Sequence, residues 1–210
     1  LNDAILYSGN NFVVENLTIT KYKGNGIMGQ AGNNFEIRNN LIVDTGVYGI
    51  FPQLGQNGVV EHNVVSGIED AAIYVGMSDN VHVAHNDVFD SVAGIEIENS
   101  RHALVTGNLV TRNTGGILVF DLPNLPVMGG GNTRIEGNLV VANDTPNFAP
   151  KGNIVASVPR GTGVMVMAND GVTISGNRLT DNPTAQILVV SYPNSFNDKS
   201  YDPRPRNVLI

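Results

Sequence analysis

The chain has 210 residues, of which 41% are hydrophobic and only 15% are charged, so one domain or one elongated array is expected. Twelve Lys and Arg against 19 Asp and Glu give a net charge of 12 − 19 = −7, which offers no electrostatic footprint for nucleic acid or an anionic membrane. The absence of cysteine excludes disulfides and thiol chemistry. The sequence also contains no run of about 18 apolar residues, the length that a membrane-spanning helix needs. The 24 glycines and many asparagines favour turns and short strands over helices.

An asparagine recurs along the chain at a nearly constant spacing and defines an internal repeat. The first spacings are 24, 23, 23 and 22 residues, and the last two, 30 and 39, are that period plus insertions. These anchors are Asn16, Asn40, Asn63, Asn86, Asn108, Asn138 and Asn177. The mostly aliphatic residues three before and two after each anchor are expected to point inward, which in the first repeat means Val13 and Thr18.

A second column, a small residue followed by an aliphatic one, comes eight to ten residues after most anchors. It consists of Gly26-Ile27, Gly49-Ile50, Ala72-Ile73, Gly94-Ile95, Gly116-Ile117, Gly163-Val164 and Gln186-Ile187. Short apolar alternations separated by turn residues at fixed offsets indicate three strands and their turns in each lap of about 22–24 residues. The sequence therefore predicts an all-β fold, a single-stranded right-handed parallel β-helix (β-solenoid) of about seven to eight coils, each with three short strands.

We expect residues 1–210 to form a single β-helix domain that is an internal fragment of a longer solenoid. Asp3 to Tyr7 matches the Gly-Ile strand of a preceding lap, and Arg206 to Ile210 matches the start of a following one. Terminal repeats of solenoids need polar caps, and neither end has one, so the alternative is that another chain or segment covers each end. Three Pro- and Gly-containing stretches, residues 121–132, 144–163 and 191–206, are predicted to be loop insertions in the C-terminal half.

The recurring asparagine is expected to be structural and not catalytic. Stacked laps place equivalent residues about 4.8 Å apart, so each Asn can take a left-handed or bridge backbone conformation at its corner and bond its neighbours through its amide. His62 and His85 occupy the same corner on adjacent laps and should lie about 5 Å apart. Corner stacking is favoured over a transition-metal site because no third ligand is apparent, and no metal site is predicted.

The outward positions of the Gly-Ile strands carry an apolar patch in the C-terminal laps. Its members are Leu118, Phe120, Met165, Met167, Leu188 and Val190. Because such patches are rarely left open on a monomer, something is expected to cover them. Either the three insertions fold down as a lid, or the patch docks a partner domain or subunit.

The same face next to this patch is expected to be uncovered and to hold a substrate-binding surface. The candidate residues are Phe51, Tyr74, Glu96, Glu98 and Asp121. Aromatic rings stack on sugar faces, and carboxylates accept hydroxyl protons or bind Ca²⁺, so the set suits a polysaccharide with Ca²⁺ as a possible cofactor. The alternative interpretation is that these acids only keep the surface soluble.

Arginines of the insertions could supply the positive charge that lyase chemistry requires. A β-eliminating lyase needs a base at the C5 proton of the sugar and a cation at the neighbouring carboxylate. Arg160, Arg204 and Arg206 are available, and Arg160 is the best-placed candidate for a catalytic residue.

The stretches "NNFEIRNNLIVDTGVYGIF", "NVHVAHNDVFDSVAGIEIEN" and "DGVTISGNRLTDNPTAQILVV" resemble the PbH1 parallel β-helix repeat over essentially the whole chain. That repeat is shared by the pectate-lyase-like superfamily, NosD-type periplasmic proteins and uncharacterised secreted bacterial proteins. The resemblance implies the fold and a secreted or periplasmic protein; function does not follow from it. The Asp-Pro-His signature of mannuronan epimerases is absent, since Arg204 stands where the His would be.

Two functional hypotheses remain open. In the first, the chain is an extracellular or periplasmic solenoid that binds an extended polysaccharide along the Gly-Ile face. Cleavage by a lyase reaction, or epimerisation of the bound polymer, is open in this hypothesis. Alternatively, it is a non-catalytic solenoid whose apolar face, at Leu118, Phe120, Met165 and Met167, docks a partner protein.

Overall fold

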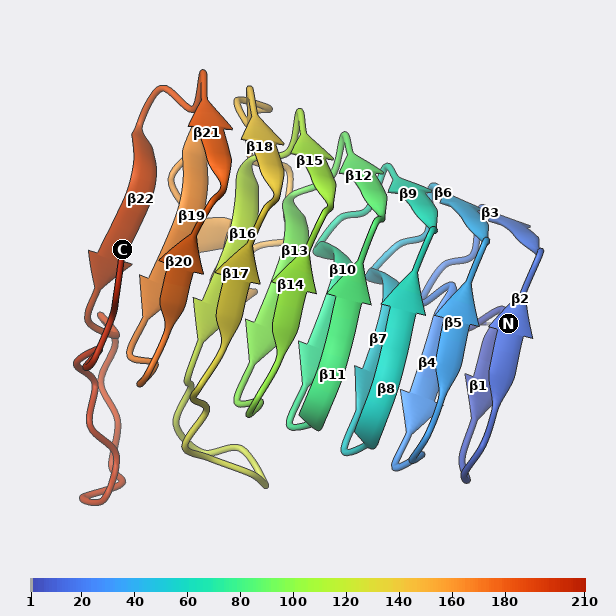
Figure 1. The fold of residues 1–210 in the computed structure, drawn as a ribbon, viewed down its shortest axis with the longest axis horizontal. Helices are drawn as coiled ribbons and strands as arrows, with labels where there is room; N and C mark the ends of the chain where they lie inside the picture. The colour runs from blue at the N-terminus through green and yellow to red at the C-terminus, as the bar shows by residue number, and fades with distance from the viewer. Residues whose placement is uncertain (1) are drawn as a thin grey trace.

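The computed structural model describes residues 2–210 and shows a right-handed parallel β-helix of about eight turns. Successive laps stack side by side along the long axis, with the N-terminal lap at one end and the C-terminal lap at the other (Figure 1). Each lap contributes one strand to each of three parallel sheets, which we call A, B and C. This confirms the fold class, the repeat and the three strands per lap expected from the sequence.

The strand bounds follow the predicted period. Sheet A consists of β1 (Ile5–Tyr7), β4 (Ile27–Gln30), β7 (Tyr48–Gln53), β10 (Ala71–Gly76), β13 (Ala93–Glu98), β16 (Gly115–Phe120), β19 (Thr162–Met167) and β22 (Ala185–Val190). Sheet B consists of β2 (Val13–Glu15), β5 (Glu36–Arg38), β8 (Gln56–Glu61), β11 (Asp79–Ala84), β14 (Leu104–Thr106), β17 (Arg134–Glu136) and β20 (Thr173–Ser175). Sheet C consists of β3 (Thr18–Thr20), β6 (Leu41–Val43), β9 (Val64–Ser66), β12 (Asp87–Phe89), β15 (Leu109–Thr111), β18 (Leu139–Val141) and β21 (Arg178–Thr180).

Stacked aliphatic side chains fill the interior. Ile73 pairs in register with Ile50 on one side and Ile95 on the other, and all three are completely buried. In sheets B and C, Val83 and Val88 of the same lap are also completely buried. Because strand side chains alternate between the two faces, one inward residue in two is enough to build this continuous core.

The asparagine ladder is present as predicted from Asn40 onward. Nδ2 of Asn86 donates to Oδ1 of Asn108 at 3.0 Å, and the backbone N–H of Asn86 donates to the same oxygen at 2.9 Å. Nδ2 of Asn86 also donates to the carbonyl of Val60 at 2.9 Å. A second ladder that the sequence analysis missed runs through Ser91, Asn113, Asn143 and Asn182.

From Asn40 onward, the ladder asparagines do not take the left-handed backbone conformation, one of the two that the sequence predicted for them. The left-handed φ belongs to the residue before each of them, for example Asn39 at 56°, His62 at 54° and His85 at 55°. One residue of each corner must turn the chain, and the following Asn is left in a conformation that directs its amide inward. The rings of His62 and His85 stack with centroids 5.3 Å apart, which confirms their predicted spacing.

The first lap is shifted by one residue relative to the sequence prediction. Asn16, at φ 60°, holds the left-handed position, and Leu17 stands at the ladder position, where its N–H donates to Oδ1 of Asn40. Val14 and Ile19 are therefore the buried residues of this lap, in place of Val13 and Thr18. The spacing of 24 residues from Asn16 to Asn40 contained the error, since the regular period here is 23.

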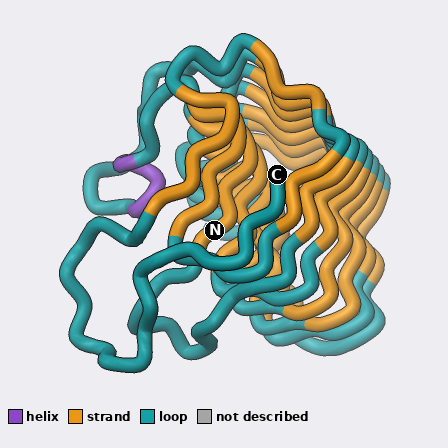
Figure 2. The backbone as a smooth tube through the Cα atoms, turned by 60° about the vertical axis from the view of Figure 1, so that its left-hand side comes forward, coloured by secondary structure: helices purple, strands orange, loops and turns teal. Residues whose placement is uncertain are grey.

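The insertions fold back onto the outward face of sheet A. Figure 2 shows the loops and the single short helical turn, η1 (Ile154–Ser157), gathered on one side of the coil. Val155 and Val158 of the second insertion and Tyr201 of the third belong to a buried cluster with the outward side chains of sheet A. The lid alternative is thus confirmed for the second and third insertions, while Leu188 and Val190 at the C-terminal end of the patch are only partly buried.

Candidate functional site

The apolar patch of sheet A does not form an open docking surface. Leu118 and Phe120 are completely buried, and Met165 and Met167 are 8% and 3% exposed. The insertions cover these side chains with their own apolar residues, so the expectation that this patch docks a partner protein has no support. No helix among residues 2–210 is long and apolar enough to cross a membrane.

The expectation that the neighbouring face is uncovered was also wrong. The structure buries Phe51, Tyr74, Glu96 and Glu98, with exposed fractions of 9%, 6%, 1% and 6%. Their outward register was predicted correctly, since Tyr74 pairs with Glu96 across adjacent strands. The burial comes from packed neighbours and the lid, which no residue pattern of the strands themselves encodes.

These residues form a buried acid and aromatic cluster, together with two members that the sequence analysis missed, Tyr48 and Asp70. The rings of Tyr48, Phe51 and Tyr74 all contact one another, with centroids 4.5 Å apart for Tyr48 and Phe51, 4.7 Å for Tyr48 and Tyr74, and 4.8 Å for Phe51 and Tyr74. The hydroxyl of Tyr74 donates to Oε1 of Glu98 at 2.5 Å. The signal for Asp70 was weak, because it precedes β10 at a turn position that carries no periodic pattern.

Burial changes the ionisation of this cluster. Desolvation raises the pKa of Asp70 to about 6 and that of Glu98 to about 7. Desolvation also raises the pKa of Glu96 well above its ordinary value, and the charge of Glu98 adds to the effect. Oε1 of Glu96 is buried with no hydrogen-bond partner among the described residues. Such shifted acids are typical of functional sites, but here the lid separates them from solvent.

The remaining two candidates lie elsewhere. Arg160 closes the base of the second insertion, where its Nε donates to Oδ1 of Asp144 at 2.7 Å and to the Asp144 carbonyl at 2.8 Å. Asp121 lies at the end of β16, at the start of the first insertion, and is 7% exposed. The structure therefore does not gather the six predicted residues into one site.

An open furrow follows the turns that connect sheet A to sheet B, and Asp121 belongs to it. We use the name turn furrow for three separate hollows of about 270, 350 and 210 Å³ that adjoin one another along these turns. The first two share Arg101, and the last two share Gly129, Gly130 and Asp170. The furrow therefore runs along the solenoid axis from the lap of Leu54 to the lap of Arg206, across successive laps.

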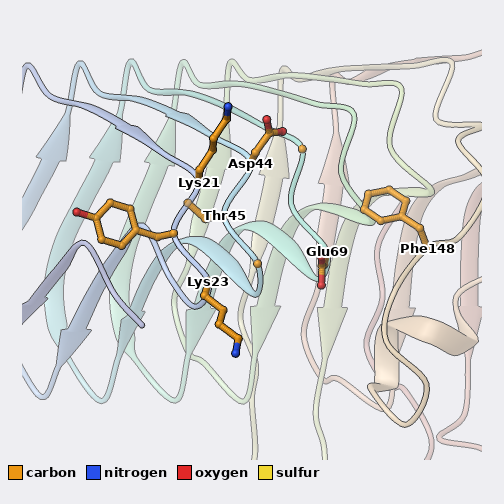
Figure 3. Close-up of a pocket in the computed structure, with 9 residues that line it drawn as sticks. Lys21, Lys23, Asp44, Thr45, Glu69 and Phe148 are labelled. Carbon is orange, nitrogen blue, oxygen red and sulfur yellow. The ribbon is translucent and has the colours of Figure 1, made fainter. Parts of the chain in front are cut away.

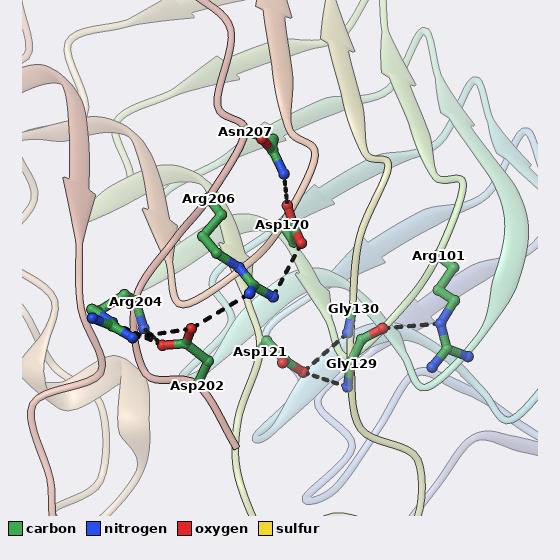
Figure 4. Close-up of polar contacts among 9 residues, drawn as sticks. All are labelled: Arg101, Asp121, Gly129, Gly130, Asp170, Asp202, Arg204, Arg206 and Asn207. Carbon is green, nitrogen blue, oxygen red and sulfur yellow. Dashed lines mark hydrogen bonds and ion pairs between the residues drawn. The ribbon is translucent and has the colours of Figure 1, made fainter. Parts of the chain in front are cut away.

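Asp121 organises the middle of the turn furrow (Figure 4). Its Oδ1 accepts hydrogen bonds from the backbone N–H groups of Gly129 at 3.0 Å and Gly130 at 3.1 Å. Burial raises the pKa of Asp121, and these two N–H groups and the charge of Arg101 oppose the rise. Arg101 fixes the same loop from the other side through the carbonyls of Gly129 at 2.9 Å and Met128 at 2.7 Å.

At the C-terminal end of the furrow, Arg206 lies between two carboxylates, and Arg204 pairs with one of them from outside the hollow. The Nη2 of Arg206 lies 3.2 Å from Asp170, and its Nη1 lies 3.6 Å from Asp202 (Figure 4). Arg204 pairs with Asp202 at 3.0 Å, and this pairing holds the pKa of the Asp202 carboxyl below its usual value. Asn207 donates to Asp170 at 2.8 Å. The furrow thus offers guanidinium groups, carboxylates and backbone amides at its surface.

Comparison with known proteins identifies the family. The family described as periplasmic copper-binding protein (NosD) matches residues 2–147 and 55–199, which together cover most of the chain. The chain belongs to the NosD family. No curated protein matches this NosD-family chain in sequence. The membership confirms the resemblance to NosD-type β-helix proteins stated from the repeat.

Solved structures share the fold at low sequence identity. A mutant of the periplasmic alginate epimerase AlgG superposes with a TM-score of 0.75 at 18% identity, covering 93% of this chain and 43% of that one. The A-module of the mannuronan C-5 epimerase AlgE6 of Azotobacter vinelandii gives 0.59 at 17% identity, covering 98% and 56%. The Dettilon tailspike protein gives 0.55 at 14% identity, covering 93% and 47%. The chain spans about half the length of these structures, and the likeness shows the fold alone.

The residues present do not fit the copper of the family name. Within residues 2–210, no group of three or more His, Cys, Asp or Glu is placed to hold a metal ion. The stacked pair His62 and His85 supplies two imidazoles, and copper in proteins usually has at least one further ligand. We therefore assign no copper chemistry to this chain.

Proposed function

We propose that the turn furrow binds an extended acidic polysaccharide, and that the protein does so in the periplasm or outside the cell. The observation that carries the proposal is that Asp121 and Arg206 line one hollow of a furrow that crosses successive laps. A polymer laid along the solenoid axis would meet new polar groups at each lap, about every 4.8 Å. The guanidinium of Arg206 suits a sugar carboxylate, because its planar donors match the geometry of that group.

The comparisons support this choice of ligand class. The family is described as periplasmic, and two of the similar folds are named as epimerases of alginate and mannuronan, which are acidic polymers. Lyase or epimerase chemistry at a bound uronate needs a base near its C5 proton and a cation at its carboxylate. Asp121, whose pKa is raised by burial, and Arg206 would take these two roles.

Titration with oligomers of mannuronate, guluronate and galacturonate tests the proposal. We expect the wild-type protein to bind one of them in a salt-dependent manner, and Arg206→Ala to lower the affinity by at least about tenfold, equivalent to roughly 1.4 kcal/mol. Arg178→Ala is the matched control, because Arg178 is exposed on sheet C and does not line the furrow. Measuring with Ca²⁺ and with a chelator shows whether Ca²⁺ bridges the polymer to the carboxylates of this acidic protein.

The same samples separate binding from catalysis. Release of an unsaturated product absorbing in the ultraviolet would reveal elimination, and exchange of the C5 proton in heavy water would reveal epimerisation. Asp121→Asn should abolish either activity while retaining binding. Absence of binding to every oligouronate, with and without Ca²⁺, would exclude the proposed function.

A further inference from the structure

We propose that a second groove, at the opposite ends of the sheet A strands from the turn furrow, binds a short neutral oligosaccharide. This groove has a volume of about 730 Å³ and lies over the turns that lead from sheet C into sheet A in the first three laps (Figure 3). It is lined by Lys21, Tyr22, Lys23, Asp44, Thr45, Gly46, Gly67, Glu69 and Phe148. We call it the lysine groove. Its volume is within the range of about 300–1,000 Å³ that is usual for ligand sites.

Two glycines explain why the surface is hollow here. Gly67 has a φ of +73°, and a Cβ at this residue would lie 2.3 Å from Oδ1 of Asp44. A Cβ at Gly46 would lie 2.1 Å from the carbonyl oxygen of Lys23. Since neither position admits a side chain without rearrangement, the floor of the groove is backbone. The hollow is therefore set by the local structure of these turns.

The charged side chains around the groove do not form ion pairs with one another. None of Lys21, Lys23, Asp44 and Glu69 takes part in an ion pair within the described residues. This contrasts with the next laps of the same edge, where Arg112 pairs with Asp90 at 2.8 Å. The donors and acceptors of the groove are consequently available to a ligand.

One wall of the groove is an aromatic side chain that the second insertion supplies. Phe148 is 43% exposed, although its neighbours are fixed. Asn147 donates to the carbonyl of Val155 at 2.9 Å and accepts from the N–H of Ala149 at 3.1 Å. An exposed ring on a backbone held on both sides is a preorganised platform, and it loses little entropy when it contacts a ligand.

The insertion is also attached to the turn that carries Glu69, another residue that lines the groove. Nδ2 of Asn153 donates to Oδ2 of Asp70 at 2.7 Å, and Asp70 directly follows Glu69. Phe148 and Glu69 therefore belong to two segments joined by a hydrogen bond between residues 83 apart in the chain. Figure 3 shows Phe148 and Glu69 on one side of the groove, and Lys21, Asp44 and Lys23 on the other.

The chemistry of the lining selects a neutral sugar. Two lysines and two carboxylates cancel in formal charge, so the groove has no net charge to attract an ionic ligand. Charged donors and acceptors make stronger hydrogen bonds to hydroxyl groups than neutral ones, and an aromatic face packs on the apolar face of a sugar ring. The lysine groove therefore differs from the turn furrow, where arginines suit a carboxylate.

Titration with neutral hexaoses tests this proposal without reference to the furrow. Cellohexaose, mannohexaose, maltohexaose and xylohexaose are added to the full chain, and binding is followed by NMR chemical-shift changes or calorimetry. We expect at least one to bind with an affinity unaffected by salt. Phe148→Ala should weaken it about tenfold, and Phe148→Leu should do so nearly as much, because an aliphatic side chain provides no flat ring face. Glu69→Ala should weaken it as well.

Lys151→Ala is the matched control, since Lys151 is an exposed residue of the same insertion that does not line the groove. Unchanged melting temperatures would show that the variants are folded. The proposal is overturned if no hexaose binds, if Lys151→Ala reduces binding as much as Phe148→Ala, or if only uronate oligomers bind and require Lys21 and Lys23. Arg206→Ala should leave neutral-sugar binding unchanged, so failure at one site is distinguishable from failure at the other.

Discussion

The interior of the solenoid and the outward face of sheet A are both buried, yet different elements bury them. In the interior, each lap covers the next, and polar side chains such as Asn86 and Asn108 bond to each other and to the backbone. On the outward face, insertions cover the strands, and Glu96 keeps a buried oxygen without a partner. The repeat gives each ladder amide an equivalent neighbour to bond, whereas an irregular lid satisfies only the groups it happens to reach.

Breaking the interior ladder should have the largest effect. Asn86→Leu leaves the carbonyl of Val60 without the amide donor of Asn86, and the backbone N–H of Asn63 without its acceptor. The side-chain amide of Asn63 loses one acceptor and keeps the carbonyls of Ile37 and Glu61. Each unsatisfied buried group costs about 1–3 kcal/mol, so we expect a loss of about 3 kcal/mol or more in the free energy of unfolding. Denaturant unfolding would measure it. A variant as stable as the wild type would show that the ladder does not stabilise the interior.

The outward face should instead make stability depend on pH. Asp70 and Glu98 have pKa values raised to about 6 and about 7, so the folded state holds their protons more tightly than the unfolded state does. Their contribution is fully present below about pH 4 and is lost as the pH rises through these values, at a cost on the order of 3 kcal/mol for each carboxyl. Unfolding of the wild type between pH 5 and 8, compared with Asp70→Asn/Glu98→Gln, isolates this contribution. A double variant with the same pH dependence as the wild type would contradict it.

Extending the ladder should give the smallest effect, a gain in stability. Leu17 occupies the ladder position of the first lap, is 39% exposed, and already donates its N–H to Oδ1 of Asn40. Leu17→Asn would place an amide donor toward the same oxygen, as in the other laps. We expect an increase of about 0.5–1 kcal/mol in the free energy of unfolding. Leu17→Ala is the control, and equal stability of the two variants would argue against a ladder bond at this end.

The repeat could be predicted from the sequence because inward apolar and outward residues alternate within each short strand. The inward position of Ile73 and the outward register of Tyr74 against Glu96 follow from a period of two residues in the strand and about 23 along the chain. The one error of register, at Asn16, arose because a single polar residue was used as anchor where the aliphatic residues Val14 and Ile19 carried the true phase.

The candidate sites could be predicted only in part. Asp121 was identified as one of the carboxylates of the Gly-Ile face, and the furrow around it needed the positions of Arg101 and Asp170, which come from other laps. The lysine groove was not predicted, since Phe148 lies more than 75 residues from Glu69 in sequence and reaches the first laps through the path of a loop.

The sequence by itself determined the coil, its three sheets, the asparagine ladder and the face from which the insertions leave. Only the tertiary structure decided what the insertions cover, which acids lose contact with water, and where open grooves remain. The physical reason is that strand periodicity fixes each residue relative to its own lap, whereas a loop of irregular sequence takes its path from contacts with distant laps. Burial, and with it the ionisation of Asp70, Glu96 and Glu98, depends on those contacts.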